Sequence, residues 1–132
     1  MNHESALQAP TALVTLVMGL GNRLLCDDAA GPLAVDVLAT QSLPAGTLLH
    51  DGGTIGLSLL PQIEDADAFV AVDAAEFGAA PGTVRVFEGL AMDTQLGGRK
   101  RSAHEVALFD LMAAAHLAGR LPVRRALVAV QP

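Results

Sequence analysis

The fold is decided by residues 13–31, whose sequence is LVTLVMGLGNRLLCDDAAG. The apolar run Leu13–Met18 is typical of a strand that is covered on both faces of a sheet. A glycine loop follows it directly and ends in two acids, Asp27 and Asp28. Acids in a turn after a buried strand are badly placed for packing, but they are well placed to hold a cation or polarise water. The stretch therefore predicts a strand that leads into a functional loop.

Strands and helices alternate along the rest of the chain. Pro32 favours the first turn of a helix after the loop. Further helices are predicted to end near Gln62 and to run from Ala103 to about Ala118. Further strands are predicted at Thr47–His50, Ala68–Asp73, Thr83–Glu88 (an edge strand) and Arg124–Val130. This order predicts a single-domain α/β fold, an open and mostly parallel twisted sheet of about five strands with helices on both faces.

One domain accounts for residues 12–132, and residues 1–11 read as a loose, flexible polar extension. We expect the polar, glycine-rich segment from Gly89 to Arg101 to be mobile. The chain stops at Gln131-Pro132, directly after the last strand, where a covering helix would be expected. One face of the sheet is therefore expected to be exposed or filled by a partner chain.

Composition excludes several classes of function. The 132 residues carry a net charge of −6, which argues against a general nucleic-acid binder. The chain has no Trp and no Tyr, so a pocket that stacks rings on bases is not expected. The apolar run Ala12–Leu20 is too short to span a membrane. The single cysteine, Cys26, cannot form an internal disulfide, and we expect a cytoplasmic protein.

Three acids follow three predicted strands. Asp28 comes after the first strand, Asp51 after the second, and Asp73 ends the third. The carboxyl ends of parallel strands lie along one edge of a sheet, where ligands bind. These acids are therefore expected to share an edge.

A histidine should reach the same edge. Ser102 and Glu105 fit a capping box, which places His104 in the first turn of a helix. The positive end of the helix dipole favours the neutral imidazole that a metal ligand requires. Two carboxylates and one imidazole suit a divalent ion such as nickel or zinc.

Each of these residues also has a structural explanation. Asp28 could lead a helix, Asp73 could cap a turn, and His104 could be structural; their convergence on one edge favours a site. The glycine loop also resembles the start of a dinucleotide fingerprint, but Leu24 stands where that fingerprint needs a small residue. Cys26 as a nucleophile is less favoured than Cys26 as a small buried thiol.

The order of the motifs resembles a known family, the nickel–iron hydrogenase maturation proteases. The motifs run from Leu13 to the last residue and are Gly-Leu-Gly-Asn with Asp27-Asp28 and Gly31, Asp51-Gly52-Gly53-Thr54-Ile55-Gly56, Val72-Asp73-Ala74 with Pro81-Gly82-Thr83, Ser102-Ala103-His104-Glu105, and Gln131-Pro132. The resemblance implies a phosphorylase/hydrolase-like fold. It also implies a cytoplasmic, aspartic-type endopeptidase that removes the C-terminal extension of the nickel-loaded hydrogenase large-subunit precursor.

The resemblance further implies the roles of individual residues. The catalytic and metal-binding set of the family falls on Asp28, Asp73 and His104, with Asp27 as a neighbour. The nickel is supplied by the precursor, and cadmium or zinc could replace it. Precursor recognition falls on Asn22 and on the motif Asp51, Gly52, Gly53 and Thr54. Either the metal or a carboxylate could activate the attacking water.

Family members usually continue past the Gln-Pro into a final helix that packs on the sheet, and this chain lacks that helix. The domain is therefore expected to be truncated at its C-terminus relative to the family. Two other functions stay open from the sequence. One is a module that binds the precursor without cleaving it, and the other is a nucleotide-binding α/β protein.

Overall fold

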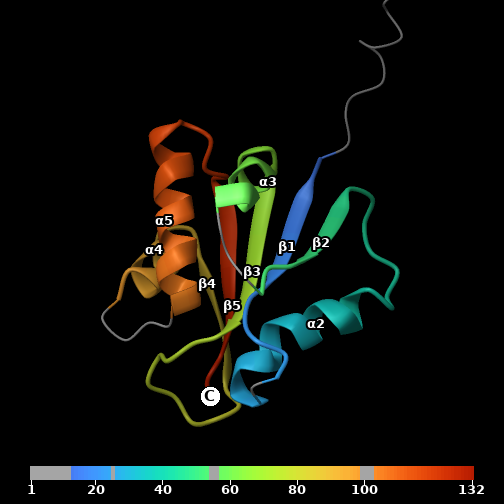
Figure 1. Ribbon diagram of the computed structural model, residues 1–132, viewed down its shortest axis with the longest axis vertical. Helices are drawn as coiled ribbons and strands as arrows, with labels where there is room; N and C mark the ends of the chain where they lie inside the picture. Colours follow the sequence, from blue (N-terminus) through green and yellow to red (C-terminus); the bar gives the residue numbers. More distant parts are fainter. Residues whose placement is uncertain (1–12, 25, 54–56, 99–102) are drawn as a thin grey trace, which may run out of the picture.

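The computed structural model describes residues 13–24, 26–53, 57–98 and 103–132. Its centre is a five-stranded sheet with the strand order β2-β1-β3-β5-β4 (Figure 1). The strands are β1 (Thr15–Gly19), β2 (Thr47–Asp51), β3 (Ala68–Ala74), β4 (Val84–Glu88) and β5 (Arg124–Val130). All five predicted strands are present, with ends that differ from the prediction by at most two residues. The predicted extension 1–11 lies outside the described residues.

Strand pairing explains why loops that are far apart in sequence meet. Strand β1 pairs in parallel with β2 and β3, and β3 pairs in parallel with β5. Strand β4 lies at the edge of the sheet, as predicted, and it pairs antiparallel with β5. Gly19 at the end of β1 is in register with Asp51 of β2 and Val72 of β3. The loops that follow these three strands therefore leave the same edge of the sheet.

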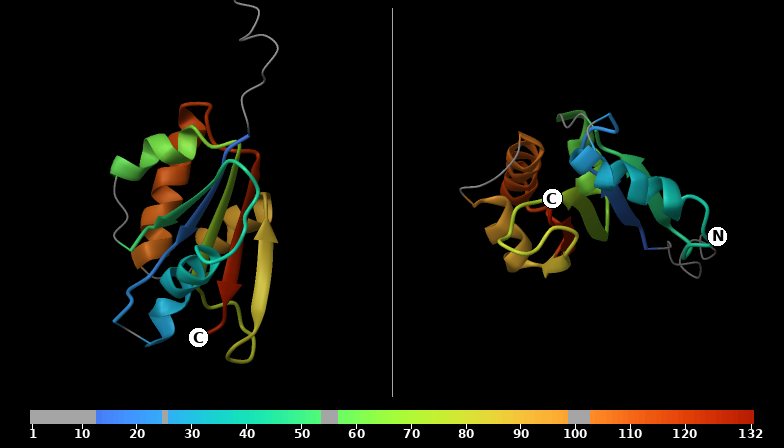
Figure 2. Two further views of the ribbon diagram at one scale, coloured as in Figure 1. Left: turned by 90° about the vertical axis from the view of Figure 1, so that its right-hand side faces the viewer. Right: turned by 90° about the horizontal axis from the view of Figure 1, so that it is seen from below.

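Helices cover both faces of the sheet (Figure 2). Helix α2 (Ala30–Leu38) packs on β1, β2 and β3 from one side. The other side carries α3 (Leu60–Glu64), α4 (Leu90–Leu96) and α5 (Ala103–Leu117), and two 3₁₀ turns, η1 (Cys26–Ala29) and η2 (Leu57–Leu59), precede α2 and α3. None of the described helices is long and apolar enough to cross a membrane.

The hydrophobic core lies between the sheet and the helices α3, α4 and α5. It is built by alternate residues of the strands, such as Leu16, Phe69 and Leu127, which are almost completely buried. The intervening residues of the strands face α2. On that face Val84 and Val86 of the edge strand β4 are more than half exposed. Part of this face is therefore exposed among the described residues.

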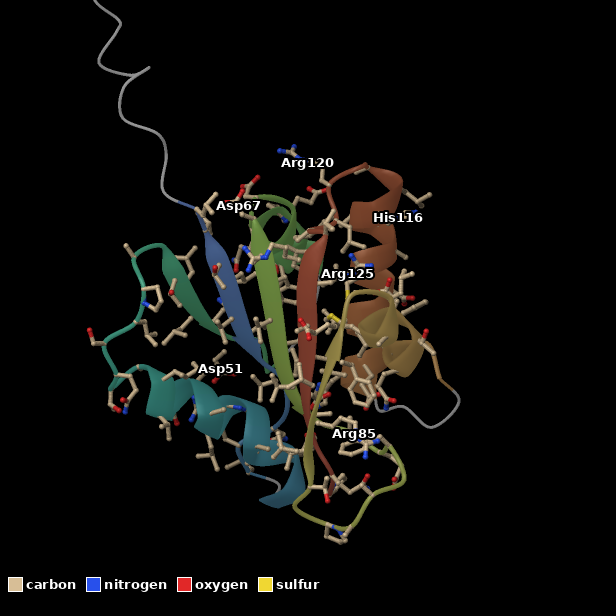
Figure 3. All side chains as sticks on the ribbon, turned by 180° about the vertical axis from the view of Figure 1, so that it is seen from behind. Asp51, Asp67, Arg85, His116, Arg120 and Arg125 are labelled. Atoms are coloured by element: carbon tan, nitrogen blue, oxygen red, sulfur yellow. The ribbon has the colours of Figure 1, made fainter. Side chains whose placement is uncertain are left out.

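The expectation of a mobile segment from Gly89 to Arg101 was wrong for its first part. Residues Leu90–Leu96 form α4, because Met92 and Leu96 are spaced by four residues and both enter the core. The helix is also held by Arg125 of β5, whose Nε and Nη2 donate to the two carboxylate oxygens of Asp93 at 2.9 and 2.6 Å (Figure 3). Residues 99–102 lie outside the described part of the chain.

Replacing Met92 by Ala tests whether α4 is an integral part of the core. The buried side chain leaves a cavity when it is truncated, so the free energy of unfolding should fall by about 2–5 kcal/mol. Leu90→Ala is the matched control on the same helix, because Leu90 is 77% exposed and its loss should cost less than about 0.5 kcal/mol. Urea denaturation measures both changes, and equal small losses would contradict the packing of α4.

Candidate active site

The glycine loop after β1 delivers Asp28 to the edge of the sheet. Asp28 lies in the 3₁₀ turn η1, and its Oδ2 accepts a hydrogen bond from the backbone N–H of Asn22 at 2.9 Å. Gly21 has a φ of +126°, and a Cβ at this position would lie 1.9 Å from the Asp28 carbonyl oxygen. A side chain at position 21 would therefore displace the turn that carries Asp28.

Gly31 makes the second close contact of this loop. A Cβ there would lie 2.2 Å from the Leu20 carbonyl oxygen and 2.5 Å from that of Val72. Helix α2 thus begins in contact with the ends of β1 and β3. Leu24, which we read as the residue that prevents this close packing, is 88% exposed and lies away from it. The glycines of the loop are explained by backbone contact within the fold, and none of these contacts requires a phosphate.

His104 meets Asp28 at this edge. The histidine is in the first turn of α5, and its Nε2 lies 3.1 Å from Asp28 Oδ2, so the imidazole N–H donates to the carboxylate. About a quarter of each side chain is exposed. Two of the three predicted ligands, separated by 76 residues in the sequence, are therefore in direct contact and accessible from outside.

Asp73, the third predicted ligand, is completely buried near the end of β3. Neither of its carboxylate oxygens has a hydrogen-bond partner among the described residues. Burial, and after it the negative charges of Glu105 and Asp28, raise the pKa of Asp73 to about 8. A buried acid with this pKa is mostly protonated at neutral pH, and such groups gather at functional sites.

The three residues do not form a ready-made metal centre. Among the described residues, no three His, Cys, Asp or Glu side chains are arranged to hold a metal ion as they stand. In this conformation His104 and Asp28 satisfy each other instead. The donor set nevertheless fits a divalent ion, because the oxygens of Asp73 lack other partners. The assignment of all three as ligands stays a prediction.

Glu105 is the second residue of the predicted capping box, which stays a prediction. Its partner in that motif, Ser102, lies outside the described residues. The structure buries Glu105 almost completely, with its charge acting on Asp73. The signal in the sequence was its spacing of three and seven residues from Leu108 and Met112, which line the buried face of α5. Glu105 therefore belongs to the polar interior of the site.

The motif proposed for precursor recognition lies beside the glycine loop. Asp51 ends β2, and its Oδ1 accepts the N–H of Gly53 at 3.1 Å. The N–H of Gly52 donates to the carbonyl oxygen of Gly19 at 2.8 Å. Thr54 lies outside the described residues, as do the side chains of Cys26 and Asp27. The described part of the motif is thus fixed to the end of β1.

Two further residues were not singled out as parts of the site from the sequence. Arg23 binds Asp51 and helix α2 and is described below. Gln131, from the Gln-Pro pair at the end of the chain, is buried, and its Oε1 accepts the N–H groups of Phe77 and Ala79 at 3.0 and 3.2 Å. Gln131 therefore holds the loop that follows Asp73.

Comparisons with known proteins identify the family of this chain. A sequence model of the family described as hydrogenase maturation protease matches residues 33–132. The hydrogenase expression/formation protein HupD of Rhodobacter capsulatus is 41% identical over 118 residues, which is 89% of this chain and 56% of that protein. HoxM of Azotobacter vinelandii is 33% identical over 123 residues, covering 92% of this chain and 59% of that protein.

A solved structure confirms the fold. The hydrogenase maturating endopeptidase HybD from Escherichia coli matches with a TM-score of 0.84 at 32% identity, over 91% of this chain and 75% of that chain. The predicted α/β architecture is therefore correct. The chain spans a little over half of the length of the two curated relatives named above.

Asp73→Asn should make stability less dependent on pH. The pKa of Asp73 is about 8 in the folded chain and about 4 when exposed in the unfolded chain. The folded chain therefore holds an extra proton between these values, and the free energy of unfolding of the wild type falls as the pH rises from about 4 to about 8. The asparagine of the variant has no proton to lose. The free energy of unfolding of Asp73→Asn should therefore fall less steeply with pH, by up to about 1.4 kcal/mol per pH unit.

Urea denaturation at several pH values measures this difference in slope. Asp110→Asn is the matched control, because Asp110 is an exposed acid on α5. Equal slopes for Asp73→Asn and the wild type would show that Asp73 is not a buried proton-binding group.

Proposed function

The chain belongs to the hydrogenase maturation protease family, and we propose that it is an endopeptidase that removes the C-terminal extension of a nickel-loaded nickel–iron hydrogenase large-subunit precursor. The observation that carries this proposal is the meeting of His104 and Asp28 at the sheet edge beside the buried acid Asp73. The names of the relatives refer to hydrogenase formation, and the HybD structure is that of an endopeptidase. These names support the reaction class proposed for this chain.

Nickel enters this proposal as part of the substrate. An ion carried by the precursor would replace the hydrogen bond between His104 and Asp28 and would use the oxygens of Asp73, which lack other partners. Imidazole nitrogen and carboxylate oxygen suit nickel, and also the surrogates zinc and cadmium. In this role the three residues test whether the precursor is loaded and place the peptide bond that is to be cut.

The two aspartates have different environments and suit different proton transfers. Asp28 accepts hydrogen bonds from Asn22 and His104 at the accessible edge, so it is held as a base that can take a proton from water. The water oxygen then adds to the peptide carbonyl carbon. Where a carboxylate and not the metal activates the water, Asp73 is no nickel ligand and keeps its proton up to about pH 8. It then gives that proton to the departing amine as the C–N bond breaks. Aspartic-type chemistry of this kind needs two carboxyl groups in different protonation states.

The precursor is proposed to lie along the loop Asp51–Gly53 and the backbone of Asn22. This loop adjoins the glycine loop through the hydrogen bond between Gly52 and Gly19. A peptide bound there would lie beside Asp28. The substrate contact and the chemical groups would therefore be placed by the same strand ends.

His104→Ala should abolish processing. Removal of the imidazole takes away one proposed nickel contact and one hydrogen bond to Asp28, and we expect cleavage to slow by at least about 100-fold. The measurement is the mass of a nickel-loaded large-subunit precursor after incubation with each variant. His116→Ala is the matched control, because His116 is an exposed residue near the other end of α5 (Figure 3).

The same mass measurement separates the proposal from its rivals. Processing by His104→Ala at the wild-type rate would refute the role of the metal contact. A wild-type chain that binds the precursor and leaves its mass unchanged would be a binding module and would refute the peptidase proposal.

A further inference from the structure

Arg23 joins three elements at the candidate site. Its Nη1 and Nη2 donate to the two carboxylate oxygens of Asp36 on α2 at 2.5 and 2.9 Å. Its Nε donates to Asp51 Oδ2 at 3.0 Å, and Nη2 lies 2.9 Å from the same oxygen. One guanidinium therefore binds two carboxylates, one from helix α2 and one from the end of β2.

The neighbours of Arg23 connect these contacts with the rest of the site. The preceding residue, Asn22, donates its backbone N–H to the Asp28 oxygen that also binds His104. Asp51 accepts a hydrogen bond from Arg23 on Oδ2 and one from the backbone N–H of Gly53 on Oδ1. These hydrogen bonds, together with the peptide link between Asn22 and Arg23, connect the proposed recognition loop with Asp28, one of the proposed nickel contacts.

We propose that Arg23 is a positioning residue that holds the Asp51–Gly53 loop in the conformation that binds the precursor. This inference rests on the proposed function and adds a residue to it. The planar contact with Asp36 fixes the orientation of the guanidinium, so that its Nε points at Asp51. Asp36 therefore orients Arg23, and Arg23 orients the loop.

The exposure of these groups argues against a purely structural role. The side chains of Arg23, Asp36 and Asp51 are 44%, 50% and 39% exposed. Ion pairs at this exposure contribute little to the stability of a fold. Hydrogen bonds to Asp36 and Asp51 raise the pKa of Arg23, and the hydrogen bonds from Arg23 lower the pKa of Asp36. Arg23 and Asp36 therefore both stay charged near neutral pH. What the contacts of Arg23 with Asp36 and Asp51 provide is a fixed conformation of the Asp51–Gly53 loop.

The test compares the kinetics of precursor cleavage by Arg23→Met, Arg23→Lys and the wild type. Arg23→Met should raise KM roughly tenfold and leave kcat within about twofold, because the loop and not the reacting groups is released. Arg23→Lys restores the charge without the planar fork, so it should raise KM by less than Arg23→Met does. Asp36→Asn should raise KM in the same direction, by less than Arg23→Met.

Arg120→Met is the matched control. Arg120 is an exposed arginine paired with Asp65 at 3.7 Å, and it lies at the top of the molecule, well away from Asp51 (Figure 3). It should leave KM unchanged. Cadmium affinity, measured directly, should be the same for Arg23→Met and the wild type, since the proposed ligands keep their places.

Two results would overturn the inference, and they differ from a failure of the proposed function. The first is a KM for Arg23→Met equal to that of the wild type. The second is a fall in kcat at constant KM, which would place Arg23 in the chemical step.

If the wild type fails to shorten the precursor, the proposed function is wrong. The dissociation constant of the precursor then decides on Arg23: a weaker complex with Arg23→Met supports its role, and an equal or absent complex refutes it.

Discussion

The close contact between the start of helix α2 and the ends of β1 and β3 is the constraint on which the rest of the site depends. At Gly31 a Cβ would lie within 2.5 Å of the carbonyl oxygens of both Leu20 and Val72. Only a residue without a side chain lets the helix begin there. This contact fixes the turn η1, and with it Asp28, over the ends of the two strands beside Asp73.

The second feature of the site is the buried carboxyl group of Asp73, which lowers the stability of the fold. Asp73 is buried next to the charges of Glu105 and Asp28, and its oxygens have no hydrogen-bond partner in the part of the chain that the structure describes. A fold selected for stability alone would place an apolar residue here. Local violations of packing rules are expected at functional sites, where the rest of the fold compensates for them. The hydrophobic core of the domain, which includes Phe69, Ala71 and Leu108, supplies that compensation.

Polar contacts, rather than packing, join the loops at this edge. Asp28 links the glycine loop to α5, Arg23 links the glycine loop to β2 and α2, and Gln131 links the last strand to the loop after β3. Each link joins segments that are far apart in the sequence. The edge can therefore keep one arrangement of its loops although its groups are partly exposed to solvent.

The sequence by itself determined the strands, the helices on both faces and the edge to which Asp28, Asp51 and Asp73 belong, because apolar periodicity and the order of elements are local properties. The family resemblance was also contained in its motifs, and it proved correct. The helix α4 was missed, because its polar and glycine-rich surroundings concealed the spacing of Met92 and Leu96. The burial of Glu105 beside Asp73 was not predicted.

Only the tertiary structure decided which groups meet. It paired His104 with Asp28, removed Asp73 from water, and gave Arg23 two carboxylate partners. The physical reason is that hydrogen bonds and charge interactions act over a few ångströms in space. The positions of their partners follow from how the sheet and helices pack, and no local pattern in the chain contains them.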